Sequence, residues 1–133
     1  SSLYVSQNSV TDISPVLQLK KLSSLYLDHN DIEDITGIGS LDRVGSFGLR
    51  GNRIKDLTPL QGARPGSFLF LEDNQITDLA PLIAMCKTDL EGEKRFAPYV
   101  QIYLRGNPLR SEASKAQLRE MKELKLRVKD MWN

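Results

Sequence analysis

Residues 22–30 have the sequence LSSLYLDHN, and the same frame occurs five times along the chain. In each copy, apolar residues stand five and three positions before an asparagine, and another apolar residue follows two positions after it. These asparagines are Asn8, Asn30, Asn52, Asn74 and Asn107. The first four are 22 residues apart and the last comes 33 residues later, so one repeat carries an insertion of 11 residues. A fixed period without slips predicts a stack of similar units.

The local chemistry of the frame predicts how each unit is built. Two apolar residues separated by one position, such as Leu25 and Leu27, point to the same face of a strand. Asparagine carries both a hydrogen-bond donor and an acceptor, so Asn30 can bond the backbone of its own turn and of the neighbouring unit. We therefore expect one short strand in each repeat, followed by a turn that an asparagine ties to the stack.

A second constant block follows the asparagine, as in residues 56–60, DLTPL. A hydroxyl residue before proline, as at Thr58 and Pro59, predicts a short helix with the hydroxyl as N-cap and proline in the first helical position. A 22-residue unit has room only for a 3-10 helix or a single helical turn. We expect the aspartates of the block to bond turn N–H groups rather than calcium, because each comes singly. They are Asp12, Asp34, Asp56 and Asp78.

The block at residues 74–82, NQITDLAPL, resembles the short class of leucine-rich repeats in internalin-like bacterial proteins and phosphatase-regulatory repeat proteins. The resemblance covers residues 1 to about 110. Residues 103–109 and the charged segment after them resemble the ends of bacterial members, particularly planctomycete ones. The resemblance implies an α/β fold: a right-handed solenoid with a parallel inner sheet and a short 3-10 or helical convex side. It also implies protein recognition through the concave sheet, without catalysis.

We predict about five repeats over residues 1–110, the first incomplete, and a C-terminal cap over residues 111–133. The cap is expected to contain a helix that begins near Ser111 and a short edge strand within residues 124–129. The 11 inserted residues are expected to lengthen one repeat with an α-helix over residues 81–90 and an exposed turn at 91–95. A structural role for this insertion is favoured over a binding role.

The N-terminal edge of the predicted stack has no visible cap. The chain is already within the strand pattern at Leu3, and a solenoid needs covering at both ends. We therefore expect further repeats or a cap before Ser1, or self-association at this edge.

Composition excludes several classes of function. The 133 residues suffice for one domain with a core. Because 18 Lys plus Arg nearly balance 17 Asp plus Glu, the net charge does not favour binding to nucleic acid or to membranes. No apolar stretch approaches the roughly 18 residues of a membrane span. The single Cys86 excludes an internal disulfide and is expected to be a buried thiol. Because His29 is the only histidine and no nucleotide-binding or metal-ligand motif occurs, we predict no catalytic, cofactor or metal site and no enzyme.

The residues six, four and two positions before each asparagine should point away from the core, onto the concave face. Aromatic rings on a solvent face are typical of binding hot spots, although a cross-strand ladder that only stabilises the sheet would also place them there. Gly48 should leave a hollow between Tyr26 and Phe70 for an anchor side chain. The column two positions before the asparagines alternates in charge, so neighbouring strands should pair these charges laterally. The predicted partner-binding residues are Tyr4, Tyr26, Asp28, Gly48, Arg50, Phe68, Phe70, Glu72, Tyr103 and Arg105.

Three columns across five strands give 15 positions, fewer than the roughly 20–30 residues a side of a standard interface. We therefore predict that the chain binds a short segment of a protein or peptide, or binds weakly. An architectural spacer within a larger repeat protein and a regulatory subunit of an intracellular enzyme remain open alternatives. The resemblance favours the cell envelope or secretion, while a cytoplasmic location is also open, and the sequence does not name the partner.

Overall fold

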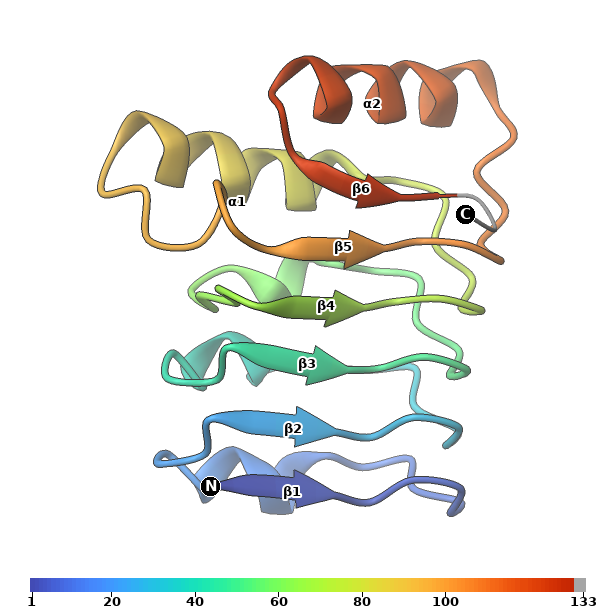
Figure 1. The fold of residues 1–133 in the computed structure, drawn as a ribbon. Helices are drawn as coiled ribbons and strands as arrows, with labels where there is room; N and C mark the ends of the chain where they lie inside the picture. Colours follow the sequence, from blue (N-terminus) through green and yellow to red (C-terminus); the bar gives the residue numbers. More distant parts are fainter. Residues whose placement is uncertain (131–133) are drawn as a thin grey trace.

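The computed structural model describes residues 1–130 of the 133-residue chain. Six parallel strands form one sheet in chain order, with all strands running in the same direction (Figure 1). The strands are β1 (Ser2–Tyr4), β2 (Ser24–Tyr26), β3 (Ser46–Gly48), β4 (Phe68–Phe70), β5 (Gln101–Tyr103) and β6 (Arg127–Lys129). The helices are η1 (Ser14–Gln18), η2 (Ile38–Ser40), η3 (Thr58–Leu60), α1 (Ala80–Glu91) and α2 (Glu112–Glu123). This is the predicted α/β solenoid.

The register places equivalent residues of successive repeats side by side. Leu25 of β2 pairs with Leu3 of β1 on one side and with Phe47 of β3 on the other. Phe47 in turn pairs with Leu69 of β4, which pairs with Ile102 of β5. Because the side-chain period of a strand is two, this register sends every central residue to the same face.

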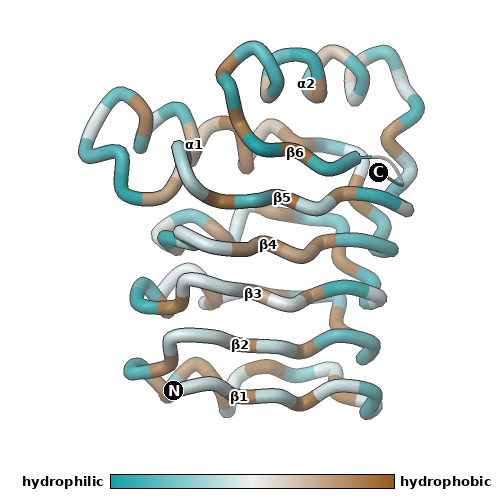
Figure 2. Tube along the Cα trace, viewed as in Figure 1, coloured by the Kyte–Doolittle hydropathy of each residue, from teal (hydrophilic) through white to brown (hydrophobic). Residues whose placement is uncertain are grey.

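The core lies between the sheet and the 3-10 turns with α1, which cover one face of the sheet only (Figure 1). Apolar segments recur at each level of the stack (Figure 2). The strand centres Leu25, Phe47, Leu69 and Ile102 are 0% exposed, so each repeat adds a layer that the next one covers. The opposite face of the sheet, which we call the open face, carries the alternate residues.

The asparagines tie each repeat to the one before it. The side-chain amide of Asn52 donates to the carbonyl oxygens of Leu27 (3.0 Å) and Leu49 (3.1 Å), which belong to two successive repeats. Its side-chain oxygen accepts from the backbone N–H groups of Asn30 (3.2 Å) and Ile32 (3.1 Å). The donor pattern to two successive strands recurs at Asn30, Asn74 and Asn107. As predicted, buried turns outside the sheet obtain their hydrogen bonds from these side chains.

The predicted hydroxyl N-cap of the 3-10 turns is wrong. The N-cap residues of η1 and η3 are Ile13 and Leu57, and neither cap has a side-chain hydrogen bond. The preceding aspartate bonds the turn instead: Asp56 Oδ1 accepts from the N–H of Thr58 at 2.9 Å. The carboxylate is the stronger acceptor. At Asp12 it accepts hydrogen bonds from both the backbone N–H and the hydroxyl of Ser14, so the hydroxyl acts as a donor and not as a cap. The predicted proline in the first helical position is also one residue off, because Pro15 and Pro59 are the second residues of η1 and η3, whereas the turn-bonding aspartates are confirmed.

The insertion forms the predicted helix α1, which is one residue longer at each end than expected, and an exposed turn follows it at residues 92–95. Asp89, near the end of α1, holds the chain that returns to the sheet. Its carboxylate accepts the backbone N–H groups of Arg95 (2.8 Å), Phe96 (3.0 Å) and Ala97 (2.8 Å). This loop positions Val100 for entry into the core before β5 begins.

At the C-terminal end of the stack, α2 begins after Ser111, whose hydroxyl accepts from the N–H of Ser114 at 3.0 Å. Ser114 is buried and its hydroxyl donates to the carbonyl oxygen of Thr77, which joins α2 to the repeats. β6 pairs with β5 and is shorter than the predicted strand. Residues 131–133, the end of the predicted cap, lie outside the described residues.

Replacing Asn52 by alanine is expected to lower the free energy of unfolding by about 2–4 kcal/mol, because buried carbonyl and N–H groups of two repeats lose their partners. Urea denaturation followed by circular dichroism measures this loss. Asn8→Ala is the matched control: Asn8 is exposed and its amide donates only to the Ser6 carbonyl, so the expected loss is below about 1 kcal/mol. Equal losses at the two positions would contradict the stabilising role of the buried asparagines.

Candidate functional site

The predicted partner-binding residues all lie on or just beyond the strands of the open face. They form columns because equivalent positions of successive strands are paired. Tyr4 is the most exposed of the aromatic residues there, at 69%. Tyr26, Phe70 and Tyr103 are half-buried.

The rings of the central column form two stacks. Tyr4 and Tyr26 stack with their centroids 4.7 Å apart. Phe70 stacks on Tyr103 at 4.9 Å and on Phe68 at 5.2 Å. The Tyr4–Tyr26 and Phe70–Tyr103 contacts join neighbouring strands, as a stabilising ladder would, but Gly48 interrupts the column and separates the two stacks.

The space directly above Gly48 is filled, which corrects the prediction of a hollow at that residue. A Cβ atom at Gly48 would lie 2.5 Å from Cδ1 of Tyr26 and 2.7 Å from Oδ2 of Asp28. Both side chains lie over the glycine because it has no side chain to exclude them, and Gly48 is therefore buried.

A hollow of about 410 Å³ is present beside this point, and Gly48 does not line it. Its walls include the rings of Tyr26 and Phe70, and its charged groups are Asp28, Arg50 and Glu72. These side chains come from the ends of β2, β3 and β4, so residues far apart in sequence meet there. The structure thus brings five of the ten predicted site residues to one hollow on the open face.

The charges at this hollow do not pair laterally as predicted. Arg50 forms its ion pair with Asp73, with 3.3 Å between Nε and Oδ2. Asp28 accepts the backbone N–H of Arg50 at 2.9 Å instead of its guanidinium. The long Arg50 side chain reaches one position further along the neighbouring repeat, to a carboxylate that the sequence analysis had not selected.

Glu72 is unusual among the charged residues of the open face. It is only 8% exposed, and its Oε1 atom has no hydrogen-bond partner among the described residues. Burial raises the pKa of Glu72, against the opposing effect of the positive charges of Arg50 and Arg105. A buried acceptor without a donor costs free energy, so this carboxyl group is a strained element of the sheet.

The rim of the open face is set by residues in the left-handed region, which the sequence analysis missed. The residue just before each asparagine has positive φ, from 55° at Asp73 to 86° at Gly106. At Gly51 and Gly106 the missing side chain admits a neighbour: His29 lies over Gly51, and Asp73 lies over Gly106. The two glycines at this position were the available signal, because glycine adopts such a conformation without steric cost. The five residues are Gln7, His29, Gly51, Asp73 and Gly106.

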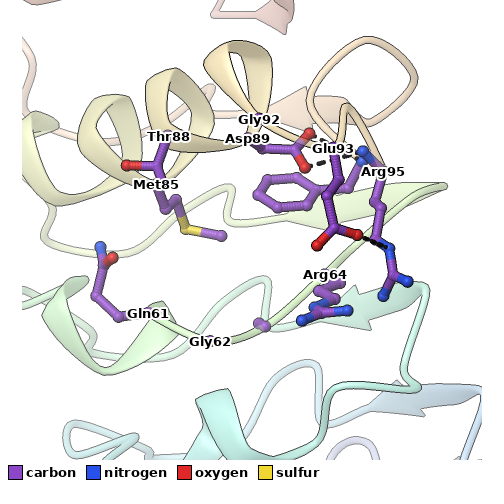
Figure 3. A pocket seen from close by; sticks show the side chains of 11 residues that line it. Gln61, Gly62, Arg64, Met85, Thr88, Asp89, Gly92, Glu93 and Arg95 are labelled. Atoms are coloured by element: carbon purple, nitrogen blue, oxygen red, sulfur yellow. Dashed lines mark hydrogen bonds and ion pairs between the residues drawn. The ribbon is translucent and has the colours of Figure 1, made fainter.

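A second hollow, of about 330 Å³, lies near the end of α1 (Figure 3). Figure 3 shows Glu93 and Arg95 of the loop near Arg64 of the segment before β4. Glu93 and Arg95 form an ion pair at 2.6 Å, and Asp89 is bonded to the loop backbone. The acidic groups of this hollow therefore already have partners within the chain.

A metal site and a reactive thiol each place requirements on the described residues, 1–130. No cluster of three or more His, Cys, Asp or Glu side chains there could hold a metal ion. Burial raises the pKa of the Cys86 thiol to about 12, so it stays protonated and is a poor nucleophile. In the same range, no helix has the length and apolar character that crossing a membrane requires.

Comparison with protein families gives a match to leucine-rich repeats (two copies) over residues 1–43. The chain has the fold of a leucine-rich repeat solenoid. No curated protein sequence matches it. Among solved structures, it is similar to an internalin C2 from Listeria monocytogenes, with a TM-score of 0.65 and 26% identity over 86% of this chain and 47% of that one.

An internalin (inlF) from the same organism has the same fold, with a TM-score of 0.65 and 23% identity over 99% of this chain and 41% of that one. This chain thus spans less than half the length of these internalins.

The state of Glu72 leads to a prediction on stability. A raised carboxyl pKa means that the folded state holds the proton more tightly than the unfolded state, so stability falls as pH rises from the ordinary glutamate value of about 4.3 through the raised value. Glu72→Gln is therefore expected to melt at a higher temperature than the wild type at pH 7, with a smaller difference near pH 4. Differential scanning calorimetry at both pH values measures this.

The control is Glu123→Gln, which removes an exposed carboxyl group of α2 and should change neither melting temperature. The turn aspartates contribute equally in all three proteins. The hydroxyl group two residues after each of these aspartates donates a hydrogen bond to the carboxylate and lowers its pKa. The stabilisation that the aspartates provide is therefore present above about pH 4 and is lost as pH falls further. They are Asp12, Asp34 and Asp56. The difference in melting temperature between Glu72→Gln and the wild type should be larger at pH 7 than at pH 4. A smaller difference at pH 7 would contradict the raised pKa of Glu72.

Proposed function

We propose that the chain is a protein-recognition module that binds a short segment of a partner protein on the open face of its sheet, which is the concave face of the predicted solenoid. The observation that carries the proposal is the hollow over β2, β3 and β4, walled by two aromatic rings and open to solvent. Aromatic side chains in desolvated positions supply most of the free energy in many interfaces. The similarity to internalins supports a repeat module that presents a surface rather than an enclosed pocket.

The size of the open face limits the partner. Strands lie about 4.8 Å apart, so the three strand steps from β2 to β5 span about 14 Å. A segment of a few extended residues, or one or two helical turns, covers this distance. The proposed ligand is therefore a short linear segment, and the residues that contact it are Tyr26, Asp28, Arg50, Phe70 and Glu72, with Tyr4, Gly48, Phe68, Tyr103 and Arg105 around them.

The stacked rings favour one competing function, that of an architectural unit. In that case Tyr26, Phe70 and Tyr103 would stabilise the sheet through their ring contacts and bind nothing. The two functions predict different effects of substituting these rings. If the rings are only architectural, a substitution changes the free energy of unfolding alone; if they bind a partner, it weakens binding even when the chain is folded.

Selection of a displayed random-peptide library on the chain tests the proposal. Peptides enriched on the wild type are expected to bind a Tyr26→Ser/Phe70→Ser/Tyr103→Ser protein at least about 30-fold more weakly, because hot-spot rings contribute 2 kcal/mol or more each. Circular dichroism establishes that the variant is folded, and fluorescence anisotropy gives the dissociation constants.

Tyr99→Ser is the control, since Tyr99 is 56% exposed but precedes β5 and lies outside the three columns. It should leave binding unchanged. If no peptide is enriched, or if enriched peptides bind the folded triple variant as well as the wild type, the open face is not the recognition surface and the architectural function is favoured.

A further inference from the structure

One of the carboxyl groups that line the hollow on the open face has an oxygen atom that the chain itself does not satisfy. Glu72 lines the hollow, is 8% exposed, and leaves Oε1 buried without a hydrogen-bond partner among residues 1–130. Such an atom is costly in isolation and is expected to gain a donor when a ligand enters. The chain therefore keeps a destabilising group at the centre of the surface assigned to recognition.

On the basis of the proposed function, we propose that this hollow takes the side chain of an arginine from the partner segment, with Glu72 and Asp28 as its acidic partners. A guanidinium offers five N–H donors in a fixed plane, which suits carboxylates on more than one side. Lysine supplies one point charge and is the weaker ligand of the two.

The positive charge already present at the hollow is directed elsewhere. Arg50 pairs with Asp73 through its Nε atom, at 3.3 Å from Oδ2, so its ion pair is with a carboxylate other than Glu72, although its charge still acts on the pKa of Glu72. The backbone N–H of Arg50 occupies only Oδ1 of Asp28. Oδ2 of Asp28 lies over Gly48, next to the Tyr26 ring. The hollow thus has carboxylate oxygens on two of its sides.

The aromatic walls fit the same ligand. Tyr26 and Phe70 stand on either side of the interruption at Gly48 and both line the hollow. A guanidinium stacks on the faces of aromatic rings, and cation–π contacts strengthen when water is excluded. The volume of about 410 Å³ is ample for one such side chain. A neutral side chain would fill the space but leave Oε1 of Glu72 without a charged donor.

Binding of a positional peptide library tests the inference. The library consists of short random peptides with one central position fixed as arginine, lysine, citrulline, leucine or glutamate. Citrulline keeps the shape of arginine and removes its charge. The wild-type chain is expected to bind the arginine set at least about tenfold more tightly than the citrulline set, as measured by fluorescence anisotropy.

In Glu72→Gln the difference between the arginine and citrulline sets should become several-fold smaller, because only Asp28 remains as an acidic partner, while Glu123→Gln should keep the difference in full. Loss of folding does not confuse the result, since Glu72→Gln is expected to be the more stable protein at pH 7. If the arginine preference is undiminished in Glu72→Gln, the assignment of the hollow is overturned.

Two other outcomes separate this inference from the proposed function. If the wild type binds peptides without preferring arginine, and the aromatic triple variant loses that binding, the recognition function stands and the arginine site is overturned. If the wild type binds none of the five sets, both the recognition function and the arginine site are overturned.

Discussion

The hydrogen bonds of the repeat asparagines are the interaction on which the rest of the structure depends. Each strand has three residues, too few to specify its own register. Asn30, Asn52, Asn74 and Asn107 donate to carbonyl oxygens of two successive repeats, so a repeat that slipped along its neighbour would lose these bonds. The apolar layers then stack in line. The same register aligns the outward side chains into columns, and these columns form the continuous surface proposed for recognition.

The candidate site arises where the columns are irregular. Gly48 interrupts the aromatic column, Tyr26 and Asp28 lean over it, and a hollow opens next to Glu72. Arg50 turns to Asp73 and leaves the Glu72 carboxyl group buried without a donor on Oε1. The stacked rings stabilise the sheet, whereas Glu72 opposes folding at neutral pH. A group that destabilises the free protein at this position is consistent with a site that a ligand completes.

The 22-residue period predicted the strands and their columns, because side chains alternate between the two faces of a strand. The 11 extra residues in one repeat predicted the long helix α1. The sequence did not predict which partner a flexible side chain selects. Arg50 lies within reach of several carboxylates, and the choice of Asp73 depends on the left-handed turn that places it. The N-cap of η1 was assigned to Ser14 for a similar reason: the sequence does not rank a hydroxyl against the nearby Asp12. Likewise, the burial of Glu72 could not be predicted, because its column also holds the exposed Ser6.

The most direct test of the recognition surface is an NMR titration of the isotope-labelled chain with acetyl-arginine methylamide, with acetyl-citrulline methylamide as the neutral reference. The account predicts backbone and side-chain shift changes centred on Asp28, Arg50 and Glu72, with the arginine compound only. Changes confined to η1, η2, η3 or α1, or equal changes with both compounds, would contradict the assignment of the open face as an acidic, aromatic recognition site.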